Sequence, residues 1–358
     1  MIERLAGVRE DVLLRFGVDA VHAVVQRLGR GHIHRTYLVR GAAQPFVLQR
    51  INETAFADPD ALVRNTELVT AALARAHRSG DYPLEWPTPL KDRQGNVLAR
   101  VDGETWRATS HLGGTYAIEE IDTVRRAEQG AQAFGRFCAA LVPVDPSRIT
   151  ELIPGFHDVE RRLEQLGRAA RADPVGRAGS AEEEIAFCRN QERMVSLLAA
   201  ASGELPRHVC HNDTKINNLL FDGNDHRPRA VIDLDTCMPG FWMHDFGDIV
   251  RTFCSAEAED SRRLDRVRVR QDVFAAVSRG FVEPLTPHLS DAERESLWLG
   301  ACAIGFVIGV RFLTDYLEGD PYFAVTRERH NLDRARNQLT LHRDLTAREN
   351  ELRPHLAT

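Results

Sequence analysis

The sequence lacks closely spaced pairs of cysteine. Six cysteines occur among its 358 residues, and each stands alone in apolar or mixed surroundings. Zinc sites and small disulfide-stapled scaffolds show close pairing, so neither is expected here. We interpret the cysteines as reduced thiols, which favours a cytoplasmic protein.

Also absent is any stretch with the composition of a signal peptide or a membrane span. Residues 1–18 carry charges throughout and contain no uninterrupted apolar core. The longest apolar run, Leu299 to Val310, is too short to cross a bilayer. Its glycines, Gly300, Gly305 and Gly309, predict instead a buried helix in close backbone contact with a neighbour.

The chain has no excess of positive charge. Its net charge is −6 at pH 7 and its pI is near 6.2. This net charge does not indicate binding to nucleic acid or to an anionic membrane surface. Any binding of phosphate must therefore be local.

Short strand patterns follow an amphipathic helix expected at residues 1–15. Runs rich in β-branched and aromatic residues, bounded by turns, predict strands. Apolar or small residues at helical spacing predict a helix over 60–76. We therefore expect an N-terminal domain, residues 1–112, with a small sheet of five antiparallel strands. The expected strands lie at 21–28, 35–40, 46–51, around 94–96 and at 106–112.

The remainder, residues 113–358, has the pattern of a mostly helical domain, and the fold class is therefore α+β. Gly113 and Gly114 offer a hinge at its start. Apolar residues recur at spacings of three and four from Val124 to Leu141, which predicts a long helix with one buried face. Further helical patterns lie at 158–201, broken near 173–180, and at about 260–345, where the Arg-rich run 262–270 predicts a solvated helix face.

The stretch from His211 to Asp248 concentrates polar side chains around two short apolar runs. Asp213 could orient and deprotonate an attacking hydroxyl, and Asn218, five residues later, offers a neutral oxygen to a metal ion. Phosphoryl transfer requires this combination. Lys215 could neutralise charge on the transferred phosphoryl group, which makes it a second catalytic candidate.

A predicted strand ends in a further set of carboxylates. Asp233 stands at its end, and Asp235 follows two residues later. Mg²⁺ prefers oxygen ligands, so Asn218 and Asp233 form a suitable pair, with Asp235 as an additional candidate. A single aspartate is more often a turn residue or a helix cap, and it is the ordered series that favours a site. Asp245 and Asp248 are expected to cap the helix that follows or to hold the loop.

His211, Asp213 and Asn218 fit the pattern H-x-D-x-x-x-x-N. This pattern resembles the catalytic loop of the aminoglycoside phosphotransferase and choline kinase superfamily, which is similar in fold to the protein kinases. The resemblance implies a bilobal fold, ATP and Mg²⁺ as cofactors, and Asp213 as the catalytic base. It also implies that Asn218 and Asp233 hold the metal ion.

Further motifs are similar to those of the N-acetylhexosamine 1-kinases. They extend from about residue 25 to 342 and cover both expected domains. This resemblance implies transfer of phosphate to the anomeric (C1) hydroxyl of an N-acetylhexosamine or a related hexose. The motifs are GHIHRTY, LQRIN, IPGFHD, HNDTKINNLLFD, VIDLDTCMPG, DFGD, RFLTDYLEGDPYF and RHNLDRARNQL.

A nucleotide site is expected in the N-terminal domain. Gly29 and Gly31 lie between two expected strands, where backbone amides could approach a nucleotide, although glycines there more often mark a hairpin turn. The third strand should supply a cation. Arg50 is available, but strand alternation leaves open whether Gln49 or Arg50 faces the phosphates. Glu67 is the candidate ion-pair partner or, equally, a solvated helical residue.

The acceptor site is expected near the C-terminal helices. Arg311 and Asp315 lie four residues apart on one helical face, where they could bind a sugar or form an ordinary ion pair. The resemblance to the sugar kinases adds further candidates, each of which could equally be structural. These candidates are His32, His157, Arg161 and Tyr322.

Two other functions stay open at this point. The same machinery could act on another hydroxyl, such as that of an aminoglycoside or an amino alcohol, but a cationic acceptor would need an acidic pocket. A nucleotide-binding pseudokinase is disfavoured, because Asp213, Asn218 and Asp233 are all present.

Overall fold

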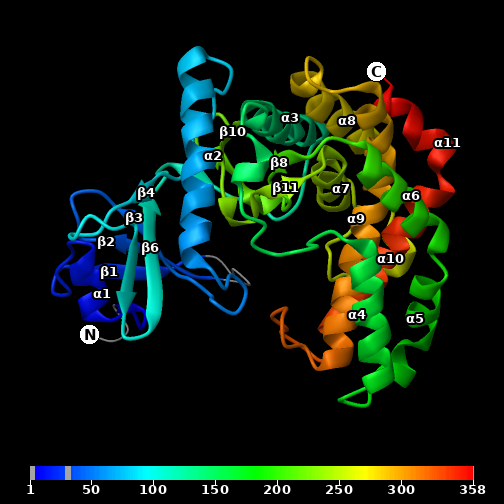
Figure 1. The fold of residues 1–358 in the computed structure, drawn as a ribbon, viewed down its shortest axis with the longest axis horizontal. Coiled ribbons are helices and arrows are strands. Elements are labelled where there is room, and N and C mark those ends of the chain that lie inside the picture. Colours follow the sequence, from blue (N-terminus) through cyan, green and yellow to red (C-terminus); the bar gives the residue numbers. More distant parts are fainter. Residues whose placement is uncertain (1–4, 29–33, 358) are drawn as a thin grey trace.

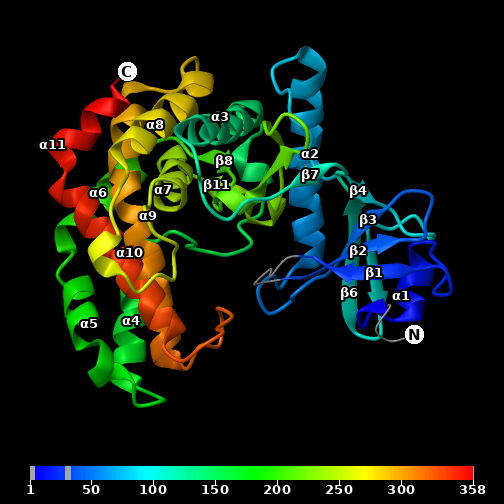
Figure 2. The ribbon, with the colours of Figure 1, turned by 180° about the vertical axis from the view of Figure 1, so that it is seen from behind.

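The computed structural model describes residues 5–28 and 34–357. A six-stranded sheet and helix α1 (Glu10–Arg15) lie at one side of the molecule, most of the helices lie at the other, and α2 (Pro59–Ser79) stands between them (Figure 1). The view from behind shows the same separation (Figure 2). We call the part formed by α1 and β1–β6 the sheet region, and the part formed by α3–α11 and β7–β11 the helical region.

The sheet region is antiparallel throughout, with the order β1-β2-β3-β6-β4 and with β5 also paired to β6. Leu48 of β3 packs into the core that contains α1, so its neighbour Gln49 faces the other side of the sheet. The structure has one strand more than predicted, because β4 is too short to show alternation. The strands are β1 (Val24–Arg27), β2 (Arg35–Arg40), β3 (Phe46–Arg50), β4 (Pro89–Leu90), β5 (Leu98–Val101) and β6 (Glu104–Ser110).

Helix α2 connects the two regions by its packing. Asp58 caps its first turn by accepting a 2.8 Å hydrogen bond from the backbone N–H of Ala61. Gly80, in the left-handed conformation at φ +88°, ends it. Leu73 is fully buried in the core of the helical region, whereas Leu62 packs against Leu98 of the sheet region. The predicted helix over 60–76 is thereby confirmed.

A short connection, residues 111–114, leads from β6 to β7 (Thr115–Tyr116). β7 pairs with β9 (Leu219–Asp222), and β9 pairs with β10 (Pro228–Val231). A second small sheet joins β8 (His208–Cys210) to β11 (Met238–Gly240). The hinge at Gly113 and Gly114 stays a prediction, and so does the domain boundary beside it.

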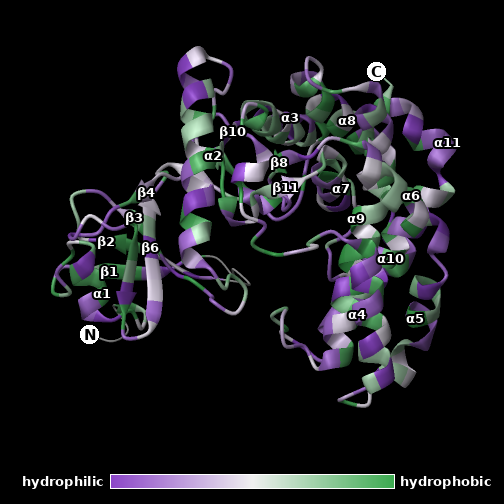
Figure 3. Ribbon diagram, viewed as in Figure 1, coloured by the Kyte–Doolittle hydropathy of each residue, from purple (hydrophilic) through white to green (hydrophobic). Residues whose placement is uncertain are grey.

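Helices form most of the remaining chain, as predicted. The Arg-rich run 262–270 is an exception, because it contains a single 3-10 turn instead of a helix. Val267 and Val269 are buried at a two-residue spacing, which suits an extended chain. α4 carries mostly hydrophilic residues (Figure 3). The helices are α3 (Val124–Leu141), α4 (Val159–Ala172), α5 (Glu182–Arg189), α6 (Glu192–Glu204), α7 (Trp242–Phe253), α8 (Gln271–Leu285), α9 (Asp291–Glu318), α10 (His330–Ala347) and α11 (Glu349–Leu352).

Helix α9 contains the apolar run and crosses α7 at very short range. A Cβ atom on Gly300 would lie 1.9 Å from the carbonyl oxygen of Met243, and one on Gly247 would lie 2.3 Å from the carbonyl oxygen of Gly300. The predicted buried helix in close backbone contact is confirmed. Its length and composition would allow a membrane span, but 78% of its most apolar window is buried inside the protein, as in a core helix.

Candidate active site

Asp245 of α7 holds the backbone of the predicted catalytic loop. Its carboxylate accepts hydrogen bonds from the backbone N–H groups of His211 (2.9 Å) and Asn212 (2.7 Å), and its carbonyl oxygen accepts one from the Thr214 hydroxyl (2.6 Å). Burial raises the pKa of Asp245, and the donors compensate this buried carboxyl group. The predicted role of holding the loop is confirmed. Asp245 does not cap the helix, which begins at Trp242.

Asn212 fixes the turn at the start of the loop. Its φ of +62° lies in the left-handed region, which asparagine tolerates better than most residues. Its side-chain amide donates to the carbonyl oxygens of Thr236 (3.0 Å) and Met238 (3.2 Å). A Cβ atom on Gly240 would lie 2.8 Å from the Asn212 Oδ1 atom. The loop is thus pinned to the segment that follows Asp233, by a residue that sequence reasoning missed.

His211 stabilises the loop from inside. Its Nε2 atom donates to the carbonyl oxygen of Ile232 at 2.9 Å. Nδ1 is therefore the acceptor for the backbone N–H of Asp213 at 3.3 Å. The ring packs edge-on against Phe134 and Phe137. One neutral tautomer satisfies both contacts.

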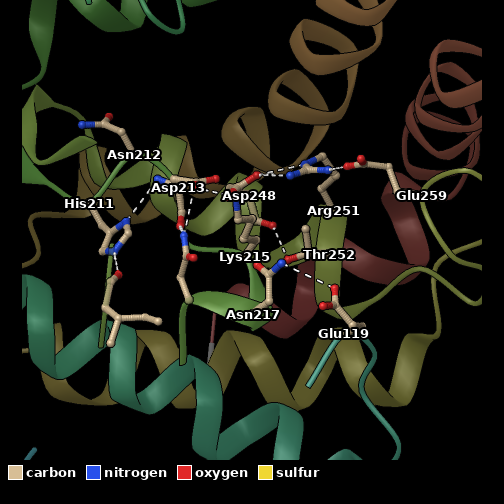
Figure 4. Close-up of polar contacts among 12 residues, drawn as sticks. Glu119, His211, Asn212, Asp213, Lys215, Asn217, Asp248, Arg251, Thr252 and Glu259 are labelled. Carbon is tan, nitrogen blue, oxygen red and sulfur yellow. Dashed lines mark hydrogen bonds and ion pairs between the residues drawn. The ribbon is translucent and has the colours of Figure 1, made fainter. Parts of the chain in front are cut away.

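Asp213 and Lys215 point toward each other in the loop (Figure 4), and Lys215 Nζ lies 2.9 Å from the carboxylate. Asn218 Nδ2 donates to the same carboxylate at 2.9 Å. Desolvation opposes ionisation of Asp213, but Lys215 and Asn218 outweigh it and lower the pKa to about 2. Burial alone would lower the pKa of Lys215, whereas Asp213 and Asp233 raise it. At neutral pH the site therefore holds a carboxylate and an ammonium ion.

Asp233 follows β10 on a left-handed backbone, with φ +61°. The residue is exposed, yet partial desolvation and the charges of Asp235 and Asp213 raise its pKa. Crowded carboxylates of this kind favour a bound cation. The Nδ2 atom of Asn218 donates to Asp213, so Oδ1 is the atom of this side chain that could serve as a metal ligand.

Amide and carboxylate oxygens are suitable ligands for Mg²⁺, which commonly takes one or two protein ligands and completes its shell with water and phosphate. Within residues 5–28 and 34–357, no three His, Cys, Asp or Glu side chains form an all-protein metal cage. A site built from Asn218 and Asp233 therefore depends on a phosphate-bearing ligand for its remaining oxygens.

Asp235 is held by residues of the sheet region. Its buried carboxylate accepts a 2.7 Å hydrogen bond from Arg107 Nη1 and lies 2.8 Å from His34 Nε2. Desolvation opposes its ionisation, but Arg107 and His34 hold the pKa of Asp235 well below its usual range. The sheet region thus occupies both carboxylate oxygens. This arrangement does not support the predicted role of Asp235 as a second metal ligand.

A buried ion pair lies beside Asp213 (Figure 4). Asp248 accepts a 2.9 Å hydrogen bond from Arg251 Nε, and Arg251 also pairs with Glu259. Burial raises the pKa of Asp248, with Arg251 opposing it. Asp248 therefore fixes an arginine whose charge is felt by Asp213, and it neither caps α7 nor contacts the loop backbone.

Arg311 of α9 presents a guanidinium group without an ion pair to any carboxylate of the described chain. Its Cζ atom lies 4.8 Å from the ring centre of Phe156, 5.7 Å from that of Tyr322 and 5.4 Å from that of Phe323. Burial lowers the pKa of Arg311, and the negative charge of Asp213 acts in the opposite direction. A desolvated cation among aromatic rings, within electrostatic range of Asp213, is suited to a polar ligand.

His157 stands between this arginine and the catalytic loop. Its Nε2 atom donates to the carbonyl oxygen of Asn212 at 3.1 Å, while its buried Nδ1 atom has no partner among the described residues. Its ring centre lies 5.0 Å from that of His244. Burial lowers the pKa of both, that of His244 to about 4, so both are neutral at pH 7. Arg162, whose pKa burial and Arg311 lower to about 10, adds positive charge.

Sequence reasoning missed His244 and Arg162, because their roles depend on neighbours from distant parts of the chain. Arg161, which was a candidate, is exposed. Arg162 directly follows Arg161 on the amphipathic helix α4, and the amphipathic pattern was the one signal that could have distinguished the two arginines.

Asp315 supports Arg311 indirectly. Its carboxylate accepts hydrogen bonds from the backbone N–H groups of Tyr322 (2.8 Å) and Phe323 (3.0 Å) and from Asn331 Nδ2 (2.8 Å). These donors occupy both of its oxygens, so the geometry does not support a direct contact with substrate or an ion pair with Arg311. Asp315 holds Tyr322, which is 44% exposed, beside the guanidinium.

A model of the phosphotransferase enzyme family matches residues 24–277, which span both regions and the whole catalytic loop. The chain belongs to this family. Solved phosphotransferases of low identity share its fold. A microcompartment-associated aminopropanol kinase is 16% identical over 98% of each chain, with a TM-score of 0.59. An aminoglycoside phosphotransferase from Alicyclobacillus acidocaldarius is 14% identical over 98% of this chain and 96% of its own, also with 0.59. A choline kinase from Cryptosporidium parvum is 13% identical over 97% and 98%, with 0.55.

In this phosphotransferase Arg50, the cation predicted to face the nucleotide, lies on the other face of the sheet. Arg50 forms an ion pair with Glu104 of β6, on the face of the sheet that carries Leu48. Glu67 is exposed on α2 and lines an open hollow with Arg148. The structure therefore does not support a nucleotide-binding pair of Arg50 and Glu67.

Strand alternation places Gln49 of this phosphotransferase on the opposite face, where its Oε1 atom accepts a 2.9 Å hydrogen bond from Arg107 Nε. The question that the sequence left open is thus answered in favour of Gln49 as the residue facing the helical region. Gly29, Gly31 and His32 lie outside the described residues, so their roles at the nucleotide and the acceptor stay predictions.

Proposed function

We propose that this phosphotransferase is an ATP- and Mg²⁺-dependent kinase that phosphorylates the anomeric C1 hydroxyl of an N-acetylhexosamine or a related hexose. We further propose that it works in the cytoplasm, in keeping with six buried free cysteines, and that its nucleotide-binding lobe ends near residue 112.

Asp213 accepts and orients the proton of the attacking hydroxyl. Its pKa of about 2 makes it a weak base, which suits an anomeric hydroxyl, because such a group is more acidic than an ordinary alcohol. Lys215, 2.9 Å away, remains protonated and neutralises charge that develops on the phosphoryl oxygens. Positioning and charge neutralisation then supply most of the rate, as is usual in phosphoryl transfer.

Asn218 and Asp233 would hold Mg²⁺ through Oδ1 and a carboxylate oxygen. When bound, the ion neutralises charge on the nucleotide phosphates. When no metal ion is bound, the ammonium group of Lys215 partly neutralises the carboxylates of Asp213 and Asp233, and both carboxylates raise the pKa of Lys215.

The observation that supports a sugar acceptor is the unpaired guanidinium of Arg311, framed by Phe156 and Tyr322. Aromatic faces and a hydrogen-bond donor fork suit an uncharged molecule with many hydroxyl groups or an acetamido carbonyl. A cationic acceptor would be repelled by Arg311 and Arg162. This disfavours aminoglycosides and amino alcohols, the acceptors named for several proteins of similar fold.

A coupled assay for ADP release, run with ATP and Mg²⁺ on a panel of acceptors, tests the proposal. The panel contains N-acetylglucosamine, N-acetylgalactosamine, galactose, kanamycin and choline, and the product anomer is assigned by ³¹P and ¹H NMR. We expect C1 phosphate from at least one hexosamine or hexose. Turnover confined to kanamycin or choline would overturn the sugar assignment, and nucleotide binding without transfer to any acceptor would favour a pseudokinase.

Arg311→Met links the acceptor to its pocket. We expect a KM for the sugar raised at least about tenfold with a smaller change in the KM for ATP, because the guanidinium contacts the acceptor only. The matched control is Arg343→Met, another arginine stacked on a phenylalanine, that of Phe187. An equal effect of both variants would remove Arg311 from the acceptor site.

A further inference from the structure

A continuous polar network crosses from the sheet region to the helical region. Thr36 Oγ1 accepts a 3.1 Å hydrogen bond from Gln49 Nε2, and Gln49 Oε1 accepts bonds from Arg107 Nε (2.9 Å) and Nη2 (2.8 Å). Arg107 then donates from Nη1 and Nη2 to the two oxygens of Asp235. Strands β2, β3 and β6 are in this way connected to the residue two positions after Asp233.

His34 lies close to the same carboxylate. Its Nδ1 atom accepts a 3.1 Å hydrogen bond from the backbone N–H of Asn52, so Nε2 carries the proton of the neutral ring. That atom lies 2.8 Å from the Asp235 carboxylate. That short distance does not have the geometry of a hydrogen bond, so His34 adds a close polar contact, and Arg107 supplies the hydrogen bonds to Asp235.

The burial of this network distinguishes it from surface ion pairs. Arg107 is 7% exposed and Asp235 is 3% exposed. A buried, bidentate arginine–carboxylate pair is geometrically specific, and loss of one partner leaves an uncompensated charge. Arg107 uses its guanidinium on Gln49 and Asp235, so it serves to align these residues and is not free to bind phosphate.

No lysine of the chain can take this place. The sequence contains only two lysines, Lys91 and Lys215. Lys91 is exposed after β4, and Lys215 is in the catalytic loop. Arg50 of the neighbouring strand β3 faces away with Glu104. Arg107 is thus the strand cation that reaches the segment carrying Asp233.

We propose that Arg107 is a positioning residue, which holds Asp235 and thereby sets the distance between the sheet region and the Asp233 carboxylate. The inference rests on the proposed function, because it assumes that nucleotide and metal ion bind between these parts. Asp235 acts as the anchor for Arg107 and is not a ligand of the metal ion.

The test compares Arg107→Met, Asp235→Asn and the double variant. Affinity for ADP is measured by calorimetry, and affinity for Mn²⁺ in the presence of ADP by electron paramagnetic resonance, both without any acceptor. We expect each single variant to weaken ADP and Mn²⁺ binding by at least about tenfold, with the loss in the double variant smaller than the product of the single losses. In kinetics, we expect the KM for ATP to rise and kcat to fall.

The matched control is Arg15→Met. Arg15 also pairs with a buried aspartate, Asp92, but both lie within the sheet region. We expect this variant to lose thermal stability without losing affinity for ADP or Mn²⁺. Arg107→Lys serves as a second variant in case Arg107→Met folds poorly. It keeps the charge but not the bidentate geometry, so we expect an affinity for ADP between those of the wild type and Arg107→Met.

Multiplicative losses in the double variant would overturn the inference, since they would mean that the two residues act independently. Loss of Mn²⁺ binding in Asp235→Asn, with Arg107→Met unchanged, would make Asp235 a metal ligand and would also overturn it. Wild-type binding of ADP without phosphorylation of any sugar would refute the acceptor assignment alone, because these binding measurements need no acceptor. A wild-type chain that binds no nucleotide would refute both proposals.

Discussion

The side-chain nitrogen of Asn218 donates hydrogen bonds to the carboxylate of Asp213 (2.9 Å) and to its carbonyl oxygen (2.7 Å). Both partners are acceptors, so they determine which end of the amide faces Asp213. The Oδ1 atom then points away from the base. One asparagine thus positions the proposed base and offers an oxygen to the proposed metal ion.

Asn218→Ala removes both contributions. We expect kcat to fall about 100-fold, because the base loses its donor, and the Mg²⁺ concentration for half-maximal activity to rise. Initial rates measured across a series of free Mg²⁺ concentrations check this. Asn217→Ala is the control, since its side-chain amide contacts Glu119 at 3.5 Å and not Asp213. Matching Mg²⁺ curves for wild type and Asn218→Ala would contradict the assignment.

Lys215→Met is expected to move the acid limb of the pH–rate profile upward. Lys215 is the main cause of the low pKa of Asp213, and desolvation, which raises that pKa, remains after its removal. The carboxylate should therefore become protonated at a higher pH than the value of about 2 in the wild type. In profiles of kcat from pH 4 to 9 we expect an acid limb in Lys215→Met but not in the wild type, and a variant profile as flat at low pH as that of the wild type would contradict the prediction. Lys91→Met, at an exposed position, provides the control.

The proximity of Asp213, Lys215 and Asn218 could be predicted because the three residues are neighbours in sequence and lie in one loop. Asp235 could not be assigned in the same way. Its partner Arg107 is 128 residues away, and strand register alone decides that the arginine faces it. The orientation of Arg50 could not be predicted for a similar reason. Strand alternation places Gln49 and Arg50 on opposite faces of the sheet, but it does not show which face a nucleotide approaches.

For the fold, too, local sequence patterns could be predicted and long-range contacts could not. The periodicity from Val124 to Leu141 predicted α3, since a buried face over five turns leaves a strong pattern. β4 has two residues and no period to detect. The charged run at 262–270 suggested a helix by composition, but buried Val267 and Val269 make it extended, a choice settled by tertiary packing.

Acid should weaken this protein partly through His244. Its pKa in the folded protein is about 4, lowered by burial, whereas the usual pKa of histidine is 6.5. The unfolded chain therefore binds the proton first, so the stabilising contribution is complete above pH 6.5 and is lost as the pH falls toward 4. We expect a loss of about 2 kcal/mol between pH 7 and pH 5 from this residue.

Urea unfolding of wild type and His244→Phe at pH 7 and pH 5 measures this contribution. The phenylalanine keeps an aromatic ring beside His157 but cannot be protonated. We expect the free energy of unfolding of the variant to fall less between the two pH values. An equal fall in both proteins would mean that His244 is not responsible for the acid sensitivity.

Gly300→Ala should disturb both stability and catalysis, because the added Cβ would lie 1.9 Å from the Met243 carbonyl oxygen of α7. Backbone cannot yield as a side-chain tip does, so we expect a loss of about 3 kcal/mol in the free energy of unfolding. Asp245, which holds the catalytic loop, lies on the same helix. A displaced α7 should therefore also lower kcat. Denaturant titrations and initial rates measure the two effects.

Gly305→Ala in the same helix is the matched control for Gly300→Ala. The closest atom to a Cβ there is the carbonyl oxygen of Gln338 at 3.8 Å, an ordinary contact distance. Alanine is a better helix former than glycine by about 1 kcal/mol, so we expect this variant to be as stable as wild type or more stable, with unchanged kcat. If both variants lost stability equally, the general intolerance of α9 to larger residues would explain the result, and the close crossing of α7 and α9 would not be its cause.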